Sequence, residues 1–472
     1  MIKTLDRLIV PITVILAFLA VIPLGSNRPW SWLLLGLLSI IIVSAQLVVD
    51  FSQTKRASKQ FQNLGPIPWL MLGLILWICI QASGLPPTAL HHPIYQDLPG
   101  TLYFSAISIT PEISVHYALR FISYCCFFWI AYRQCHNLPD TERLIHWLLW
   151  GYAAIFLYAI LTFLTGQYKT QVLWLPNPWS SGGISGTFVN PNHFGAYSAL
   201  GGLLAACQLK LATNSLGLSG VYDRKVALKI LLSESSHPRI AVPTSIFVIA
   251  TITVLLTNSR GAVISYMFGL FMFFFVFQGK WFARKFLRPF QSLPTIGRTV
   301  VILAALILLI GLYYLPFVQT SLSTIDNVRA EIAVAIALAI ADNAIIGTGA
   351  GSFEHAFQPY RGEFQPGVTF KYAHNSILQN ALELGIVGMI FLYIALAMIF
   401  EKLQSGAAIR KRAKPIAALG ISVILTATLH SLVDFAYEIP AITAMFSIIL
   451  GMCIGAIGSD TRGNVEPSDH RK

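Results

Sequence analysis

A histidine stands where a polar stretch gives way to an apolar helix, in the run FKYAHNSILQNALELG at 370–385. Histidine exchanges a proton near neutral pH, so His374 can act as a general base toward a hydroxyl group. Asn375, beside it, is a candidate for substrate binding. The alternative for His374 is an ordinary interfacial ring that forms hydrogen bonds.

Glu383 lies on the same helix but cannot assist His374. Nine residues at about 100° each place the two side chains on opposite faces, roughly 13 Å apart along the axis. Glu383 is instead a carboxylate at mid-membrane depth that needs a partner of its own. Arg120, the basic residue that lies well inside an apolar span, is the expected partner.

An arginine separates two apolar runs in LLTNSRGAVIS at 255–265. Arg260 must lie at the membrane surface or in a polar cavity, since a buried unpaired guanidinium is costly there. Gly261 is expected to permit a tight turn. A guanidinium suits bidentate contact with phosphate, and contact with lipid headgroups is the alternative.

A helix start is expected in GGISGTFVNPNHFGAYSALGG at 182–202, with Asn190 as the N-cap and Pro191 at the first helical position. The free N–H groups of such an end favour anions, including phosphate. Asn190 and Asn192 are therefore candidates for substrate binding, although an ordinary capped helix is the alternative. His193 is expected to be a hydrogen-bonding neighbour.

A second arginine opens the run VRAEIAVAIALAIADNAIIGTGAGSF at 328–353. Its apolar spacing predicts a helix at the membrane interface, and Arg329 either binds substrate or faces solvent. The GTGAGS run resembles a nucleotide loop, but no strand precedes it, so a tight turn is expected. Arg361, further along, is another candidate for substrate binding.

A histidine and an aspartate are four residues apart in LHSLVDFAYEIPA at 429–441. His430 and Asp434 are expected to share a helix face. A structural ion pair or cap is one role for them, and Asp434 is also a candidate for substrate binding.

The composition identifies a membrane protein. The 472 residues are 55% hydrophobic and 11% charged, whereas soluble domains carry charge on roughly a quarter of their residues. The mean hydropathy is +0.67. Six cysteines lie in or beside apolar segments without metal-ligand spacing, and no metal or other cofactor is expected.

Apolar runs predict an all-α, polytopic protein of about 12 spans. The expected spans are 8–24, 31–49, 67–83, 116–134, 145–165, 191–209, 240–257, 262–278, 299–317, 376–400, 415–431 and 439–457.

Basic residues predict the orientation of these spans. When the connections between spans are assigned alternately to the two sides of the membrane, one side carries few lysines and arginines. The basic residues on that side are Arg28, Lys169, Arg260, Arg329, Arg361 and Lys371. Arg120 belongs to neither side, because it lies within a span. The positive-inside rule then places both termini in the cytoplasm, so the net charge of +12 reflects topology and membrane-lipid contact, not nucleic-acid binding.

The chain is expected to form one domain, 1–472. A large loop at 318–375 precedes the tenth span on the far side of the membrane, and 458–472 form a cytoplasmic tail. All the candidate residues fall on the far side, which favours one extracytoplasmic site over scattered surface polarity.

The ordered motifs GTFVNPNHFGAY, TNSRGAVIS, GTGAGSF and AHNSILQNALELGIVG resemble those of the O-antigen ligase and polymerase superfamily. HSLVDFAYEIPA is similar to the last outer motif of that superfamily. The motifs cover about residues 180–445.

This resemblance implies a glycosyltransferase of the bacterial inner membrane with a periplasmic active site. It implies transfer of a glycan from undecaprenyl pyrophosphate to a glycan, lipid A-core or protein acceptor, without a metal. Attack opposite an α-linked leaving group would invert the anomeric carbon. The functional pair of the superfamily maps onto Arg260 and His374, and its loop arginine onto Arg329.

Three alternatives stay open. Chain polymerases and protein O-glycosyltransferases share these motifs. A transporter or flippase would also have many spans, but polar residues at depth are few and no internal repeat is visible. A non-catalytic scaffold is the third alternative, for which embedded arginines are a costly choice.

Overall fold

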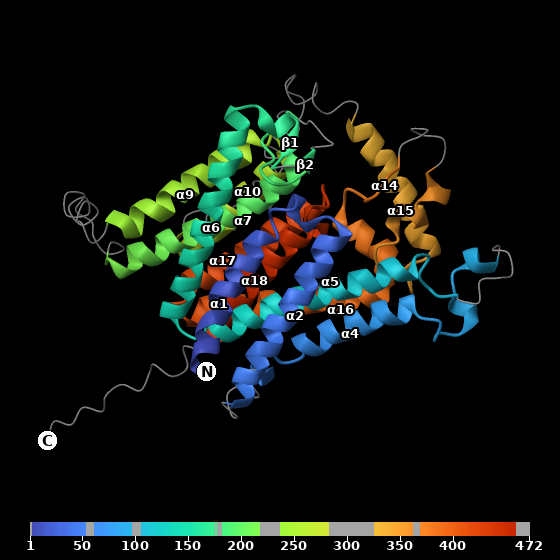
Figure 1. The fold of residues 1–472 in the computed structure, drawn as a ribbon, viewed down its shortest axis with the longest axis horizontal. Helices are drawn as coiled ribbons and strands as arrows, with labels where there is room; N and C mark the ends of the chain where they lie inside the picture. The colour runs from blue at the N-terminus through green and yellow to red at the C-terminus, as the bar shows by residue number, and fades with distance from the viewer. Residues whose placement is uncertain are drawn as a thin grey trace, which may run out of the picture.

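The structure is a computed structural model that describes residues 2–52, 61–96, 105–173, 175–176, 182–217, 237–282, 325–361 and 369–458. Its long helices form one elongated bundle, in which α9 and α4 lie at opposite edges (Figure 1). They are α1 (Ile2–Leu19), α2 (Pro29–Ser52), α4 (Ile67–Ala82), α5 (Pro111–Gln134), α6 (Leu138–Leu164), α7 (Pro191–Ser215), α9 (His237–Leu256), α10 (Arg260–Phe282), α14 (Ile325–Asp342), α16 (Ser376–Ile409), α17 (Lys414–Ser431) and α18 (Pro440–Gly458).

Short elements connect these helices. They are η1 (Leu24–Ser26), η2 (Thr88–Leu90), η3 (Pro93–Gln96), η4 (Gln167–Lys169), β1 (Gln171–Val172), β2 (Leu175–Pro176), α15 (Phe353–Ala356), η7 (Gln358–Tyr360) and η8 (Ala436–Glu438). The two strands form a minimal antiparallel pair in which Gln171 opposes Pro176.

The prediction of an all-α polytopic membrane protein is confirmed. Eight of the described helices are long and apolar enough to cross a membrane, namely α2, α5, α6, α9, α10, α16, α17 and α18. Helices α1, α4 and α7 overlap three further expected spans. The expected span 299–317 and most of the expected tail lie outside the described residues.

Helix α7 is the central helix of one half of the bundle. Every residue from His193 to Cys207 is buried. Small residues allow close packing, because a Cβ atom at Gly201 would meet the Tyr152 ring at 2.6 Å and one at Gly202 would meet Tyr266 at 2.3 Å. Protein rather than lipid covers this helix, which explains why it is less apolar than its neighbours.

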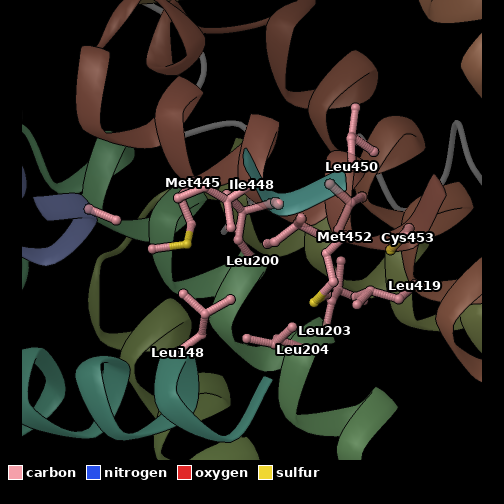
Figure 2. Packing of buried hydrophobic residues seen from close by; sticks show 14 of the residues in the cluster. Leu148, Leu200, Leu203, Leu204, Leu419, Met445, Ile448, Leu450, Met452 and Cys453 are labelled. Carbon is pink, nitrogen blue, oxygen red and sulfur yellow. The ribbon is translucent and has the colours of Figure 1, made fainter. Parts of the chain in front are cut away.

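The main hydrophobic core forms where α6, α7, α17 and α18 meet (Figure 2). Leu148 of α6 and Leu200 of α7 approach Met445 and Ile448 of α18, and Leu419 of α17 lies on the other side of the cluster. Such packing fixes the ends of these helices relative to one another, and the candidate residues lie at those ends.

Helix α14 confirms the helix expected in the large loop. One face, with Ile332 and Ile336, packs against Phe353 and Leu382 in a second, smaller core. The other face exposes apolar residues, including Leu338 at 60%. A helix that is apolar on both faces suits a position against lipid.

Helix α16 is broken at Gly385, whose φ of 60° and ψ of −178° are almost exclusive to glycine. Backbone groups on both sides of the break form hydrogen bonds with the segment that contains the glycine-rich turn predicted from GTGAGS. The amide of Gly349 donates to the Glu383 carbonyl at 2.9 Å, and that of Ile386 donates to the Ala344 carbonyl at 2.8 Å. Helix α4 completes the pairing, since Trp77 Nε1 donates to the Leu384 carbonyl at 2.9 Å.

The carboxylate of Glu383 binds this same turn. It accepts hydrogen bonds from the amides of Gly351 at 2.7 Å and Phe353 at 3.2 Å, and from Gln379 Nε2 at 3.1 Å. The expected pairing with Arg120 is therefore wrong. Backbone amides of a neighbouring segment, which sequence spacing does not reveal, solvate the buried carboxylate.

We expect Gly385→Ala to destabilise the protein. Its Cβ would lie 2.5 Å from the amide nitrogen of Gly347 and from the carbonyl oxygen of Ile345, and the backbone conformation alone costs about 1–3 kcal/mol. The unfolding temperature in detergent is the measurement. Gly182→Ala is the matched control, because a Cβ there meets nothing within 4 Å. Equal unfolding temperatures for the two variants would contradict this account.

Candidate functional site

Most of the candidate residues, but not Arg329 and Arg361, gather where α7, α10 and α16 begin and where α17 ends. The segment before α7 packs on the turn between α9 and α10, because the Ile184 amide donates to the Leu256 carbonyl at 3.0 Å. Asn258 Nδ2 also donates to the Gly182 carbonyl at 3.2 Å. These contacts bring together segments that are far apart in the sequence.

The start of α7 is capped as predicted. The side chain of Asn190 accepts a hydrogen bond from the Asn192 amide at 2.8 Å, and Pro191 follows the cap. The side chain of Asn192 makes a separate contact, in which its Nδ2 donates to Asp434 Oδ2 at 2.8 Å. The asparagine pair therefore holds the loop between α17 and α18 against the start of α7.

Asp434 is a buried carboxylate, with 2% of its surface exposed. Its Oδ1 lies 3.4 Å from His193 Nε2. Burial alone would raise the pKa of Asp434, but His193, His430 and Asn192 outweigh that effect and hold the pKa well below its ordinary value. Asp434 is therefore ionised at neutral pH.

The Phe435 ring connects three side chains of the site. Tyr372 stacks on it, with ring centroids 4.3 Å apart and an interplanar angle of 11°. His374 and His193 each meet it at a steep angle, with centroid distances of 4.9 Å and 4.7 Å. Both histidines are thus held on one aromatic residue.

His374 lies just outside helix α16 and has a left-handed backbone conformation, with φ of 52°. Asn375 is the N-cap, since its Oδ1 accepts from the amides of Ile377 and Leu378 at 3.0 Å each. Its Nδ2 donates to the Leu432 carbonyl at 2.9 Å. Asn375 therefore positions His374 against the loop that carries Asp434 and Phe435.

Arg260 is the first residue of α10 and is exposed. The glycine after it is needed for packing, because a Cβ at Gly261 would meet Val433 at 2.8 Å. The left-handed residue of this turn is Asn258, with φ of 55°, and not Gly261 as expected. Arg260 and His374 are thus both adjacent to the loop between α17 and α18.

The other two arginines belong to the unit formed by α14 and α15. Arg329 lies in α14, and its side chain is outside the described residues. Arg361 follows η7, and its amide approaches the Gln358 carbonyl at 3.4 Å. A role for either in binding substrate stays a prediction.

His430 and Asp434 do not share a helix face, because α17 ends at Ser431. The Asp434 amide donates to the His430 carbonyl at 3.0 Å, and the Asp434 side chain meets Asn192 and His193 instead. Among the described residues, no direct ion pair joins the His430 and Asp434 side chains, although His430 still lowers the pKa of Asp434 electrostatically.

Sequence reasoning did not identify Tyr372 or Phe435 as parts of the site. Both are aromatic residues beside apolar helices, where such residues are common, and nothing in their spacing marks them. Within the described ranges, no group of three or more His, Cys, Asp or Glu side chains is placed to hold a metal ion.

We expect Asp434→Asn to lower the stability of the protein at pH 7 by about 1–3 kcal/mol, since it removes the charge that His193 and Asn192 surround. A carboxylate with a lowered folded pKa stabilises at pH values above its unfolded pKa of about 3.9. That contribution is lost as the pH falls through the folded pKa, so the difference from wild type should shrink below about pH 4.

The measurement is the unfolding temperature of the purified protein at pH 7 and at acidic pH. Asp140→Asn is the control, because Asp140 is 39% exposed and pairs with an exposed arginine. An Asp434→Asn protein as stable as wild type at pH 7 would overturn the assignment.

Comparisons with known proteins bear on this arrangement. Residues 245–393 match the family model described as O-antigen ligase. No curated protein matches the sequence. The matched segment contains Arg260, Arg329, Arg361, His374 and Asn375, whereas Asn190, Asn192 and Asp434 lie outside it. The match confirms the resemblance of this multi-pass membrane chain to the O-antigen ligase and polymerase superfamily, and residues 245–393 are the segment that carries it.

Proposed function

We propose that this protein transfers a glycan from an undecaprenyl-pyrophosphate carrier to an acceptor hydroxyl. The O-antigen ligase match supports a membrane glycosyltransferase of this general kind. The observation that carries the finer proposal is the contact of four distant segments at one end of the bundle, where Arg260 and His374 both border the loop with Asp434 and Phe435.

His374 accepts the proton of the acceptor hydroxyl as that oxygen attacks the anomeric carbon. The new bond from carbon to the acceptor oxygen forms as the bond from carbon to the pyrophosphate oxygen breaks, and the electron pair leaves with the pyrophosphate. Attack from the face opposite the leaving group inverts the anomeric carbon. No metal is required for these steps, because arginine side chains can stabilise the charge of the leaving group.

Arg260 is the residue that we assign to the departing pyrophosphate, with Arg329 as a second cation from α14. An exposed arginine at a helix start offers both its guanidinium and the nearby N–H groups to an anion. Asn190, Asn192 and Asp434 hold the site together, and Asn375 orients His374. Arg361 is assigned to the part of the loop that meets the acceptor.

The site faces the periplasm in this proposal, and both termini lie in the cytoplasm of a bacterial cell with the protein in the inner membrane. The distribution of lysine and arginine supports this orientation. The acceptor is lipid A-core, a growing glycan or a protein, and these three correspond to a ligase, a polymerase and a protein O-glycosyltransferase.

We expect His374→Ala and Arg260→Ala each to reduce glycan transfer by about 10²-fold or more, while the protein still inserts at normal abundance. General-base and charge-stabilising groups contribute factors of about this size. Transfer from a lipid-linked glycan to an added acceptor in proteoliposomes is the measurement.

The matched controls are His355→Ala and Arg143→Ala, since both side chains are exposed and neither belongs to the site. Normal transfer by both site variants would refute the transferase mechanism. Substrate flux into sealed vesicles that survives His374→Ala would favour a transporter instead.

A further inference from the structure

A large cavity lies between α4, α5, α16, α17 and α18 and has a volume of about 400 Å³. Its walls are mostly apolar. At one end it is lined by Ser376, Ser431 and Glu438, which belong to the segments that form the candidate site. At the other end it is lined by Leu64 and Ile399. The cavity therefore runs from the candidate site along the bundle.

Arg120 is the cation in this cavity wall. It is buried, with 3% of its surface exposed. One guanidinium nitrogen donates to the Glu438 carbonyl, and Nε donates to the Tyr124 hydroxyl at 3.4 Å. The guanidinium carbon also lies 4.3 Å from the centroid of the Tyr117 ring. These contacts hold the group in place without neutralising it.

The lack of a counter-ion distinguishes Arg120 from the other buried arginine of α5. Arg133 forms a two-pronged ion pair with Asp50. Among the described residues, by contrast, no carboxylate oxygen lies within 4.0 Å of Arg120. Burial raises the pKa of the nearby Glu438 carboxyl, although Arg120 opposes that shift. A buried cation without a counter-ion indicates that an anion binds there.

The length of the cavity indicates the rest of the ligand. Its lining on α5 extends from Tyr117 to Trp129, roughly 18 Å of helix at ~1.5 Å per residue. On α16 the lining residues, from Ser376 to Ile399, lie on both sides of the break at Gly385. One leaflet of a bilayer provides only about 15 Å of hydrocarbon. An occupant that fills the cavity therefore has a chain longer than one leaflet holds.

We propose that this cavity binds the carrier lipid, with the long polyprenyl chain along its apolar walls and a phosphate group at Arg120. This inference rests on the proposed function and adds Arg120 as a residue that contacts the carrier. Ser376 follows Asn375 directly, so a phosphate at this end of the cavity lies beside the segment that holds His374. The carrier enters from the lipid between helices, and its glycan extends toward the site.

The test is native mass spectrometry of the full chain with undecaprenyl phosphate added in detergent. We expect wild type to bind one molecule, and Arg120→Met to bind it about tenfold more weakly, with Arg120→Lys in between. Ala427→Trp should also weaken binding, because Ala427 lines the cavity and a large ring there fills it. Ala397→Trp is the matched control, since Ala397 is exposed on the outside of α16.

Phosphatidylglycerol is the competitor that separates the carrier from bulk anionic lipid. Equal displacement by phosphatidylglycerol would overturn the proposal, as would unchanged binding by both Arg120→Met and Ala427→Trp. If Ala427→Trp does not fold, the Arg120 pair decides the outcome, because methionine keeps the apolar volume of the arginine stem.

The two proposals fail in different ways. His374→Ala should bind undecaprenyl phosphate as wild type does while it loses transfer. Normal transfer by His374→Ala together with lost binding by Arg120→Met would refute the role assigned to His374 and leave the lipid site intact. Wild-type binding and transfer by Arg120→Met would refute the lipid site alone.

Discussion

Backbone hydrogen bonding at the break in α16 is the constraint on which the rest of the structure depends. A membrane interior leaves no free backbone group without a partner, so a broken helix survives only where protein supplies the missing partners. Here the glycine-rich turn and helix α4 supply these hydrogen-bond partners. The Glu383 carboxylate also accepts hydrogen bonds from backbone amides of the same turn. The short first segment of α16 is thereby fixed in direction. Because His374 directly precedes that segment, a loop residue is anchored to a rigid element of the fold.

The loop between α17 and α18 is the second organising element, and it serves several helices at once. Asp434 accepts a hydrogen bond from Asn192 at the start of α7, and Phe435 contacts the rings of two histidines. The Glu438 carbonyl accepts a hydrogen bond from Arg120. The matched O-antigen ligase segment ends at residue 393, before this loop begins. The loop therefore joins the matched segment to the flanking helices α5 and α7, and the candidate site includes residues from both.

Local features were predicted well from sequence because their causes are local. Asn190 caps a helix through its own neighbours, and helix α14 follows from apolar spacing. The partner of Glu383 was missed because it is the backbone of a segment about thirty residues away, and backbone amides carry no sequence signal. The aromatic role of Phe435 was missed for a similar reason. Its partners come from α7 and from the segment before α16, and only tertiary packing brings them together.

The burial of α7 has a consequence for how the protein is made. Its glycines and other small residues pack against rings of neighbouring helices, so lipid alone offers it little stabilisation. In a nascent chain, α7 therefore depends on packing against two other helices for its stability in the bilayer. Helix α6 is synthesised before it, and helix α9 follows it. Assembly of this half of the bundle is then cooperative: the helix whose first turn borders the site becomes stable only after its neighbours have inserted.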